Sequence, residues 1–204
     1  RPLMAYPLLA ATGSRLVECL FVSTDSPQIA AVAREHGAEV IDRPATLCTA
    51  TALGEEAFAH GYRVIRDRLA GEGQAIELMV LLFANAATVT SDLIDQGITR
   101  LRADPNLDSA VTVSRYNMWS PLRARKVDPD GLLTPWVPLE VFGDPQTLTC
   151  DRDSQGDVYF ADMGLSVVRP RCLERLEDGR LPQRWMGRRI APIHSEAGCD
   201  VDYA

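Results

Sequence analysis

The chain has 204 residues, of which 46% are hydrophobic and 24% are charged. This length and composition are typical of one well-filled globular domain, and they exclude intrinsic disorder, collagen-like repeats and coiled coils. The 21 basic and 28 acidic residues give a formal charge of −7. An acidic chain does not attract a phosphate backbone, so we expect no nucleic acid as the main partner.

No apolar run reaches the roughly 20 residues of a membrane span, and the first residues lack the order of a signal peptide. Five widely spaced cysteines without a Cys-x-x-Cys pair indicate neither a disulfide framework nor a zinc site. We therefore expect a reduced, cytoplasmic protein with no membrane partner.

Helical patterns alternate with short apolar runs along the first half of the chain and return near its end. A capping serine and a proline at Ser26-Pro27 mark one helix start, and Gly37 marks that helix's end. The most hydrophobic run, 76–84, predicts a central strand. The helices are expected over 2–11, 28–36, 53–69 and 93–103, and the strands over 16–22, 38–41, 76–84, 109–114, 165–168 and 190–193.

The segment 115–157 differs, because it is rich in proline, glycine and aspartate and has no helical period. The turn sequence Asp128-Pro129-Asp130-Gly131 predicts a hairpin within it. Alternation of strands and long helices elsewhere predicts an α/β fold with a mainly parallel sheet. Ligands of such sheets bind at the carboxyl ends of the strands, where the loops 23–26, 42–51 and 85–90 are expected.

Two patterns near these strand ends could bind a ligand, one a metal ion and the other a phosphate or a base. Asp200 and Asp202 are two positions apart, so on an extended segment both carboxylates face one side and can meet one Mg²⁺ ion. A solvated acidic terminus would look the same. Arg43 follows a strand and could form forked hydrogen bonds to a phosphate or a base, although a surface salt bridge with Asp42 or Glu39 is the simpler interpretation.

Together these positions resemble the acylneuraminate (CMP-sialic acid synthetase-like) cytidylyltransferases. The resemblance is carried by Val22-Ser23-Thr24-Asp25-Ser26, Ile29-Ala30-x-Val32-Ala33, Gly37-Ala38-Glu39-Val40 and Arg43-Pro44-Ala45-x-Leu47, and by Asp200-Val201-Asp202 at the other end. It implies one Rossmann-like nucleotidyltransferase domain over 1–204, with an inserted dimerisation and sugar-side segment over about 115–157.

The resemblance also implies a reaction and its residues. The anomeric hydroxyl of an acidic, sialic-acid-like sugar would attack the α-phosphate of CTP and release pyrophosphate in a Mg²⁺-dependent homodimer. Asp200 and Asp202 would be catalytic and hold the metal. The nucleotide would lie against Arg43, Thr51, Ala52 and Asn85, and the sugar against Arg152, Tyr159 and Gly164.

Several positions depart from the family. Its first strand and glycine-rich phosphate loop have no counterpart here, which predicts that this sequence is part of a longer one. Phe83 stands where the family has a sugar-contacting glutamine, and Met163 and Val167 replace an amide and a phenol. The sugar is therefore expected to be another nonulosonic or an octulosonic acid. Two alternatives stay open: a nucleotidyltransferase for another nucleotide or sugar, and a non-catalytic nucleotide-binding relative.

Overall fold

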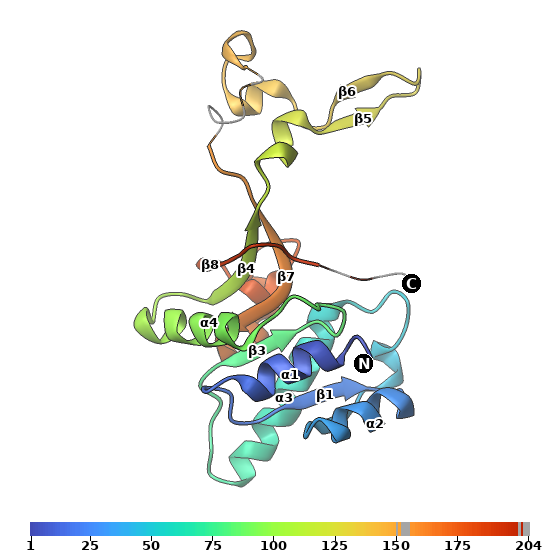
Figure 1. The fold of residues 1–204 in the computed structure, drawn as a ribbon, viewed down its shortest axis with the longest axis vertical. Helices are drawn as coiled ribbons and strands as arrows, with labels where there is room; N and C mark the ends of the chain where they lie inside the picture. The colour runs from blue at the N-terminus through green and yellow to red at the C-terminus, as the bar shows by residue number, and fades with distance from the viewer. Residues whose placement is uncertain (150, 152–155, 200, 202–204) are drawn as a thin grey trace. The chain divides into compact units, whose positions relative to one another are not determined.

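A computed structural model describes residues 1–149, 151, 156–199 and 201, and the chain divides into two compact units. The larger unit comprises Arg1–Val113 and Asp162–Ala204, and the smaller unit is Ser114–Ala161. In Figure 1 the larger unit is built of helices and strands, whereas the smaller has a short hairpin and irregular segments. No helix among the described residues is long and apolar enough to cross a membrane.

The larger unit has the alternation of helices and strands that the sequence predicts. Its helices are α1 (Ala5–Gly13), α2 (Pro27–Glu35), α3 (Gly54–Gly71), α4 (Ser91–Ala103) and α5 (Pro170–Glu174). Its strands are β1 (Phe21–Thr24), β2 (Glu39–Asp42), β3 (Met79–Leu82) and β8 (Ile190–Ser195), with β4 (Ser109–Arg115) and β7 (Tyr159–Val168) continuing into the smaller unit. The α/β fold class is thereby confirmed.

These strands form two separate sheets. β1 and β2 pair in parallel, from Phe21 opposite Glu39 to Thr24 opposite Asp42. The second sheet has the strand order β3-β7-β4-β8, with β3 antiparallel to β7. The run 76–84, predicted to be central, therefore forms an edge strand. The strand predicted over 16–22 begins only at Phe21, where the register with β2 starts, although the carbonyl of Leu20 already accepts a hydrogen bond from the backbone N–H of Glu39 at 2.9 Å.

Helix α2 begins and ends where local chemistry predicts. The side chain of Ser26 accepts a hydrogen bond from the backbone N–H of Ile29 at 3.4 Å, and Pro27 occupies the first turn. Gly37 follows the helix with φ +77°, a conformation that suits glycine. The helix then leads directly into β2, so β1, α2 and β2 form a compact parallel βαβ unit.

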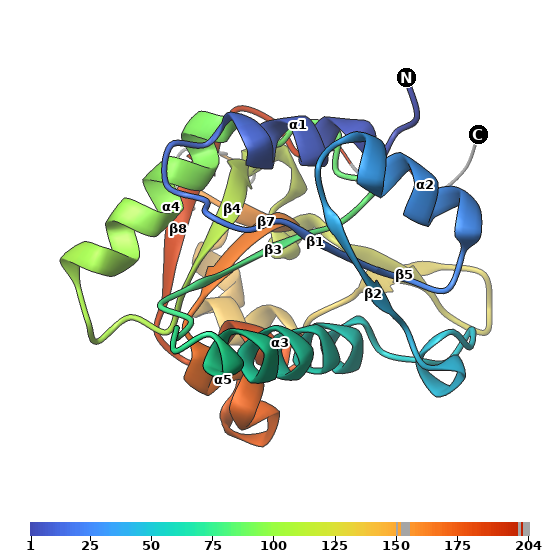
Figure 2. The ribbon, with the colours of Figure 1, turned by 90° about the horizontal axis from the view of Figure 1, so that it is seen from below.

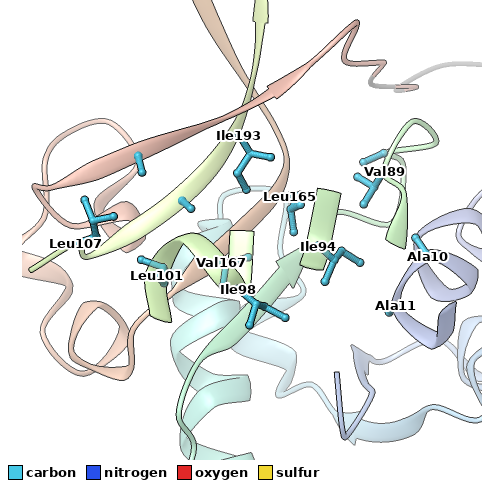
Figure 3. Close-up of a cluster of buried hydrophobic side chains, with 13 residues drawn as sticks. Ala10, Ala11, Val89, Ile94, Ile98, Leu101, Leu107, Leu165, Val167 and Ile193 are labelled. Atoms are coloured by element: carbon cyan, nitrogen blue, oxygen red, sulfur yellow. The ribbon is translucent and has the colours of Figure 1, made fainter. Parts of the chain in front are cut away.

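Helix α4 packs against the four-stranded sheet and forms the main core there (Figure 3). Its apolar face repeats at helical spacing through Ile94, Ile98 and Leu101, which are at most 3% exposed. These side chains pack in one cluster with Leu165 and Val167 of β7, and this packing fixes the helix over the sheet.

Helices α1 and α4 are tied together by polar contacts at the end of α1. The nearly buried carboxylate of Asp95 accepts hydrogen bonds from the Ser14 hydroxyl at 2.6 Å and from Arg15 Nε at 3.2 Å. The Ser14 hydrogen bond, helped by Arg15, lowers the pKa of Asp95 although burial opposes this. The Ser91 hydroxyl donates to the carbonyl of Ala10 at 2.8 Å. Together these bonds fix the direction in which the chain leaves α1 for β1.

The smaller unit contains the predicted hairpin, formed by β5 (Arg125–Val127) and β6 (Leu133–Pro135). Asp128 stabilises its turn, because its side chain accepts hydrogen bonds from the backbone N–H groups of Asp130 and Leu132 at 3.0 and 2.8 Å. Within the same unit, the rings of Tyr116, Trp119 and Phe160 stack or meet edge-to-face at 5.8 to 6.3 Å.

Gly97→Ala tests how closely α4 approaches the sheet. A Cβ at this position would come within 2.7 Å of both Ile193 Cδ1 and Val167 Cγ2. We expect a loss of about 1–3 kcal/mol in the free energy of unfolding, measured by urea denaturation. In Gly61→Ala, the matched control in α3, a Cβ meets nothing within 4 Å. That variant should gain about 0.5–1 kcal/mol. Equal stability of the two variants would contradict the packing described here.

Candidate functional site

The carboxyl ends of β1 and β2 are joined through Arg43. Its backbone N–H donates to the carbonyl of Thr24 at 3.2 Å. Its guanidinium donates through Nε to the Ser23 hydroxyl at 3.2 Å and through Nη2 to the Ser23 carbonyl at 2.5 Å. These bonds hold the guanidinium of Arg43 at the edge of the parallel pair. It is partly buried there, in a position where it can bind an anion or a base carbonyl.

The loop after β2 returns towards the end of β1. The Cys48 thiol donates to the carbonyl of Pro44 at 3.3 Å, and it also interacts with Asp25, which follows β1 directly. Desolvation raises the pKa of Cys48, and the hydrogen bond and negative charge of Asp25 raise it further. The thiol is therefore held in its neutral form, and this loop carries no activated nucleophile at Cys48.

Thr51 and Ala52 lie in the turn that precedes α3. The backbone N–H of Ala52 donates to the carbonyl of Thr49 at 3.1 Å, and the hydroxyls of Thr49 and Thr51 are 3.3 Å apart. Thr51 is exposed and Ala52 is half-buried. The turn therefore presents polar groups beyond the end of β2.

The segment 83–90 leaves β3 at the side of the unit where β1 also ends (Figure 1). Ala86 and Val89 are buried under β7, and a Cβ on Gly164 would lie 3.1 Å from Ala86 Cβ and 3.4 Å from Val89 Cγ2. Asn85 precedes this anchor and is half-buried. The close approach explains why position 164 is glycine, and it fixes the loop that carries Asn85.

Asp162 organises the neighbouring part of β7. Its Oδ1 accepts a hydrogen bond from the backbone N–H of Gly164 at 3.1 Å and another from the Thr112 hydroxyl. Met163, between Asp162 and Gly164, has φ +59°, which is a strained conformation for a residue with a side chain. Such local strain is often found at functional sites.

A small cavity of about 80 Å³ lies between the loop after β3 and the part of β7 around Met163. The chain passes it again after β8, where the backbone N–H of Cys199 donates to the Thr88 hydroxyl at 3.3 Å and Gly198 lies against the Asp162 side chain. The described chain at 199 therefore stands beside Asp162 immediately before the predicted metal ligands. The lining residues are Phe83, Ala86, Thr88, Asp162, Met163, Gly164, Gly198 and Cys199.

The predicted site residues do not all lie in the same part of the structure. Arg43, Thr51 and Ala52 follow β2, Asn85 follows β3, and Gly164 lines the small cavity. Tyr159 belongs to the smaller unit, where its hydroxyl donates to Asp157 at 3.4 Å. The catalytic and metal-ligand predictions for Asp200 and Asp202 and the sugar-binding prediction for Arg152 lie outside the described residues.

Sequence reasoning missed Asp162 as a member of this site. No short-range pattern marks it, because its place depends on the left-handed Met163 and on the segment that returns after β8. Phe83 has a structural role that its position in the family pattern does not convey. Its ring meets those of Phe58 and Trp185 at 5.4 and 6.4 Å, which makes this wall of the site apolar.

Comparison with known proteins relates the chain to nucleotidyltransferases. It is 37% identical over 67 residues to an N-acylneuraminate cytidylyltransferase of Escherichia coli O18:K1:H7 (strain RS218 / NMEC), a match that covers 33% of this chain and 16% of that protein. The resemblance seen in the sequence is thereby confirmed. The matched stretch is about one sixth of the curated relative's length. No protein-family profile matches the chain.

Solved structures agree on the fold. A CMP:2-keto-3-deoxy-manno-octonic acid synthetase complexed with CTP superposes with a TM-score of 0.64 at 13% identity, covering 99% of this chain and 83% of that one. A 4-diphosphocytidyl-2C-methyl-D-erythritol synthase from Anaerococcus prevotii DSM 20548 gives 0.63 at 11% identity, covering 100% and 81%. The chain has a Rossmann-like nucleotidyltransferase fold.

Arg43→Ala tests the nucleotide-binding role of this edge. Loss of a charged donor in a partly buried position costs about 1.5–3 kcal/mol, so affinity for a bound nucleoside triphosphate should fall about tenfold or more, measured by calorimetry. Arg34→Ala, which removes an exposed arginine of α2, is the matched control and should change affinity less than about twofold. If Arg43→Ala binds as tightly as Arg34→Ala, Arg43 only ties β1 to β2.

Proposed function

We propose that the chain is the nucleotide-transferring part of a cytidylyltransferase that joins CMP from CTP to a sialic-acid-like acidic sugar. In this reaction an anomeric hydroxyl oxygen forms a bond to the α-phosphorus of CTP. The bond from that phosphorus to the bridging oxygen of the β-phosphate breaks, and pyrophosphate leaves. The local sequence match, the CTP complex of a protein with the same fold and the polar edge described above support this proposal.

The proposal is carried by one segment in which the resemblance in sequence and the position in the fold point to the same site. The block 22–47, where the sequence resembles the family best, folds as β1, α2 and β2 and brings Asp25 and Arg43 to one sheet edge. Ligands of α/β folds bind at this edge. Arg43 would bind the nucleotide by directed hydrogen bonds, and Thr51, Ala52 and Asn85 would supply shape and polar contacts around the base and ribose.

The donor set near the end of the chain fits Mg²⁺. Among the described residues, no group of three histidine, cysteine, aspartate or glutamate side chains could hold a metal ion. Asp200 and Asp202, which lie outside the described residues, would hold the ion together with phosphate oxygens, as the resemblance implies. When bound, it would neutralise charge on the phosphates. The protein's own residues would hold the sugar hydroxyl in line with the bond that breaks at the α-phosphorus of CTP.

The residues expected to contact the sugar favour an acceptor other than ordinary sialic acid. The cavity beside Gly164 has Phe83 and Met163 on its wall, where the family pattern has polar groups. Arg152 would pair with the sugar carboxylate and Tyr159 would contribute an aromatic face. An acidic nonulosonic or octulosonic acid with an apolar substituent facing Phe83 is the substrate class that these residues favour.

The smaller unit supports a homodimer. It exposes Trp119 and Trp136 by 65% and 64%, together with Leu133 by 71%, which is unusual for large apolar side chains of a monomer. Aromatic residues are enriched in protein interfaces, and we propose that this unit binds a second copy of itself.

Calorimetric titration with CTP, UTP, GTP and ATP, with and without Mg²⁺, tests the proposal. We expect selective, Mg²⁺-dependent binding of CTP, followed by pyrophosphate release when an acceptor from a panel of acidic sugars is added. Selective binding of another nucleotide would keep the reaction class and change the donor. Binding of CTP without release with any sugar would favour the non-catalytic relative. The absence of binding to all four nucleotides would contradict the proposal.

Asp202→Asn tests the metal assignment separately. Removing one ligand charge should lower Mg²⁺-dependent pyrophosphate release about a hundredfold or more, without changing the thermal midpoint of unfolding. Asp130→Asn, at the exposed turn of the β5–β6 hairpin, removes the same charge elsewhere and should retain full activity. Normal activity in Asp202→Asn would show that the metal is held by other residues.

A further inference from the structure

The segment 169–189, which connects β7 to β8, concentrates positive charge. It contains seven arginines and three acidic residues, a formal charge of +4 within a chain whose total is −7. Like charges held close together repel one another, so such a cluster creates a local field that attracts anions. The arginines are Arg169, Arg171, Arg175, Arg180, Arg184, Arg188 and Arg189.

This segment lies at the end of the four-stranded sheet that is opposite to the proposed nucleotide edge. Arg169 directly follows β7, and Val168, the last residue of β7, pairs with Met79 at the beginning of β3. The nucleotide edge is formed instead by the loops that follow β1, β2 and β3. Within the segment, α5 packs beside α3 (Figure 2). An anion bound here would therefore not touch the residues proposed to bind the nucleotide.

A depression of about 440 Å³ opens between this segment and the residue that precedes β4. Its charged lining consists of three arginines and two aspartates, namely Arg171, Arg175, Arg188, Asp108 and Asp178. Cys172 also lines the depression, but burial and the negative charge of Asp108 raise the pKa of its thiol to about 11. The thiol therefore stays neutral, and the lining as a whole is positive.

Asp108 is occupied by hydrogen bonds from the protein itself. Its Oδ1 accepts from Arg171 Nε at 2.8 Å, and its Oδ2 accepts from the backbone N–H groups of Arg188 and Arg189 at 2.8 and 2.9 Å. Burial alone would raise the pKa of Asp108, but these three hydrogen bonds lower it. A Cβ on Gly187 would lie 2.5 Å from Asp108 Cβ, so the approach requires glycine there. Asp108 thus fixes the walls of the depression.

The three lining arginines are each held through Nε, which leaves terminal nitrogens available to a ligand. Arg188 Nε donates to the carbonyl of Asp178 at 2.6 Å, and Arg175 Nε pairs with the Asp178 carboxylate at 3.3 Å. Among the described residues, the terminal nitrogens of Arg175 and Arg188 and the Nη1 atom of Arg171 have no hydrogen-bond partner. Guanidinium groups held in this way can bind several oxygens of one phosphate group.

Two further arginines border the depression. The backbone N–H of Arg180 donates to the carbonyl of Gly187, which belongs to the lining, at 3.1 Å, and Arg189 follows Arg188 directly. Both side chains are exposed, and in the part of the chain that the structure describes neither forms an ion pair. An anion with a single charge would leave much of this positive charge uncompensated, whereas a compact oxyanion with two or more charges matches it.

We propose that this depression is a second anion site, which binds inorganic phosphate or diphosphate. The three lining arginines would donate to the oxygens, while Arg180 and Arg189 would add attraction from the rim. The inference stands on the arginine cluster and on the frame around Asp108. It does not depend on the nucleotide or sugar used at the opposite end of the sheet.

Backbone amide NMR of the chain tests the proposal. Phosphate is added in one titration and diphosphate in another, without Mg²⁺ and with the ionic strength held constant by chloride. We expect saturable shift changes at Gly179, Gly187 and Arg188, with a Kd of about 1 mM or below for phosphate and about tenfold lower for diphosphate. Changes confined to the loops 23–26, 42–52 and 83–90 would overturn the proposal, as would the absence of saturable changes.

Matched arginine substitutions locate the anion. Arg175→Gln and Arg188→Gln each remove an exposed guanidinium of the lining, and each should weaken phosphate binding about fivefold or more. Neither should change the thermal midpoint without anion or the affinity for CTP. Arg34→Gln, on exposed α2, should change phosphate affinity less than about twofold. If all three variants bind phosphate equally well, the anion is not held by this depression and the proposal is wrong.

Discussion

The contact between α1 and α4 is the interaction on which the candidate site depends. β1 and β2 form a ladder of only four residue pairs, and an isolated two-stranded sheet has little stability of its own. Because no strand ladder among the described residues joins this pair to the larger sheet, helix packing holds the two together. Asp95 and Ser91 on α4 bind the end of α1, and buried Leu8 of α1 packs against Ala33 and Ala38 around β1 and β2.

This arrangement explains why the polar groups of the site lie where they do. Arg43 spans the ends of β1 and β2, while Gly164 and the buried Ala86 fix the loop after β3. Asp162, next to the left-handed Met163 of β7, lies against Gly198 in the segment that follows β8. Each half of the site is thus built on a different sheet.

Much of the larger unit could be predicted from the sequence, because the signals are local. The cap at Ser26, the stop at Gly37 and the apolar face of α4 each depend on residues within a few positions of one another. Strand limits were predicted less well. Whether residues 16–20 join a strand depends on a partner elsewhere in the fold, which hydrophobicity alone does not reveal.

The site was only partly predictable for the same reason. Arg43 follows a strand end and could be recognised from its position, and the resemblance to the family added its role. Asp162 has its place in the site because of a left-handed residue in a strand and a chain segment that returns from β8. Neither has a short-range pattern in the sequence.

Backbone amide NMR of the chain, recorded as CTP and Mg²⁺ are added, tests the central claim most directly, because it reports which residues the nucleotide reaches. The account predicts that the largest shift changes fall in the loops 23–26, 42–52 and 83–90, at the carboxyl ends of β1, β2 and β3. Changes confined to the smaller unit, or no changes at saturating CTP, would contradict a nucleotide site at this edge of the fold.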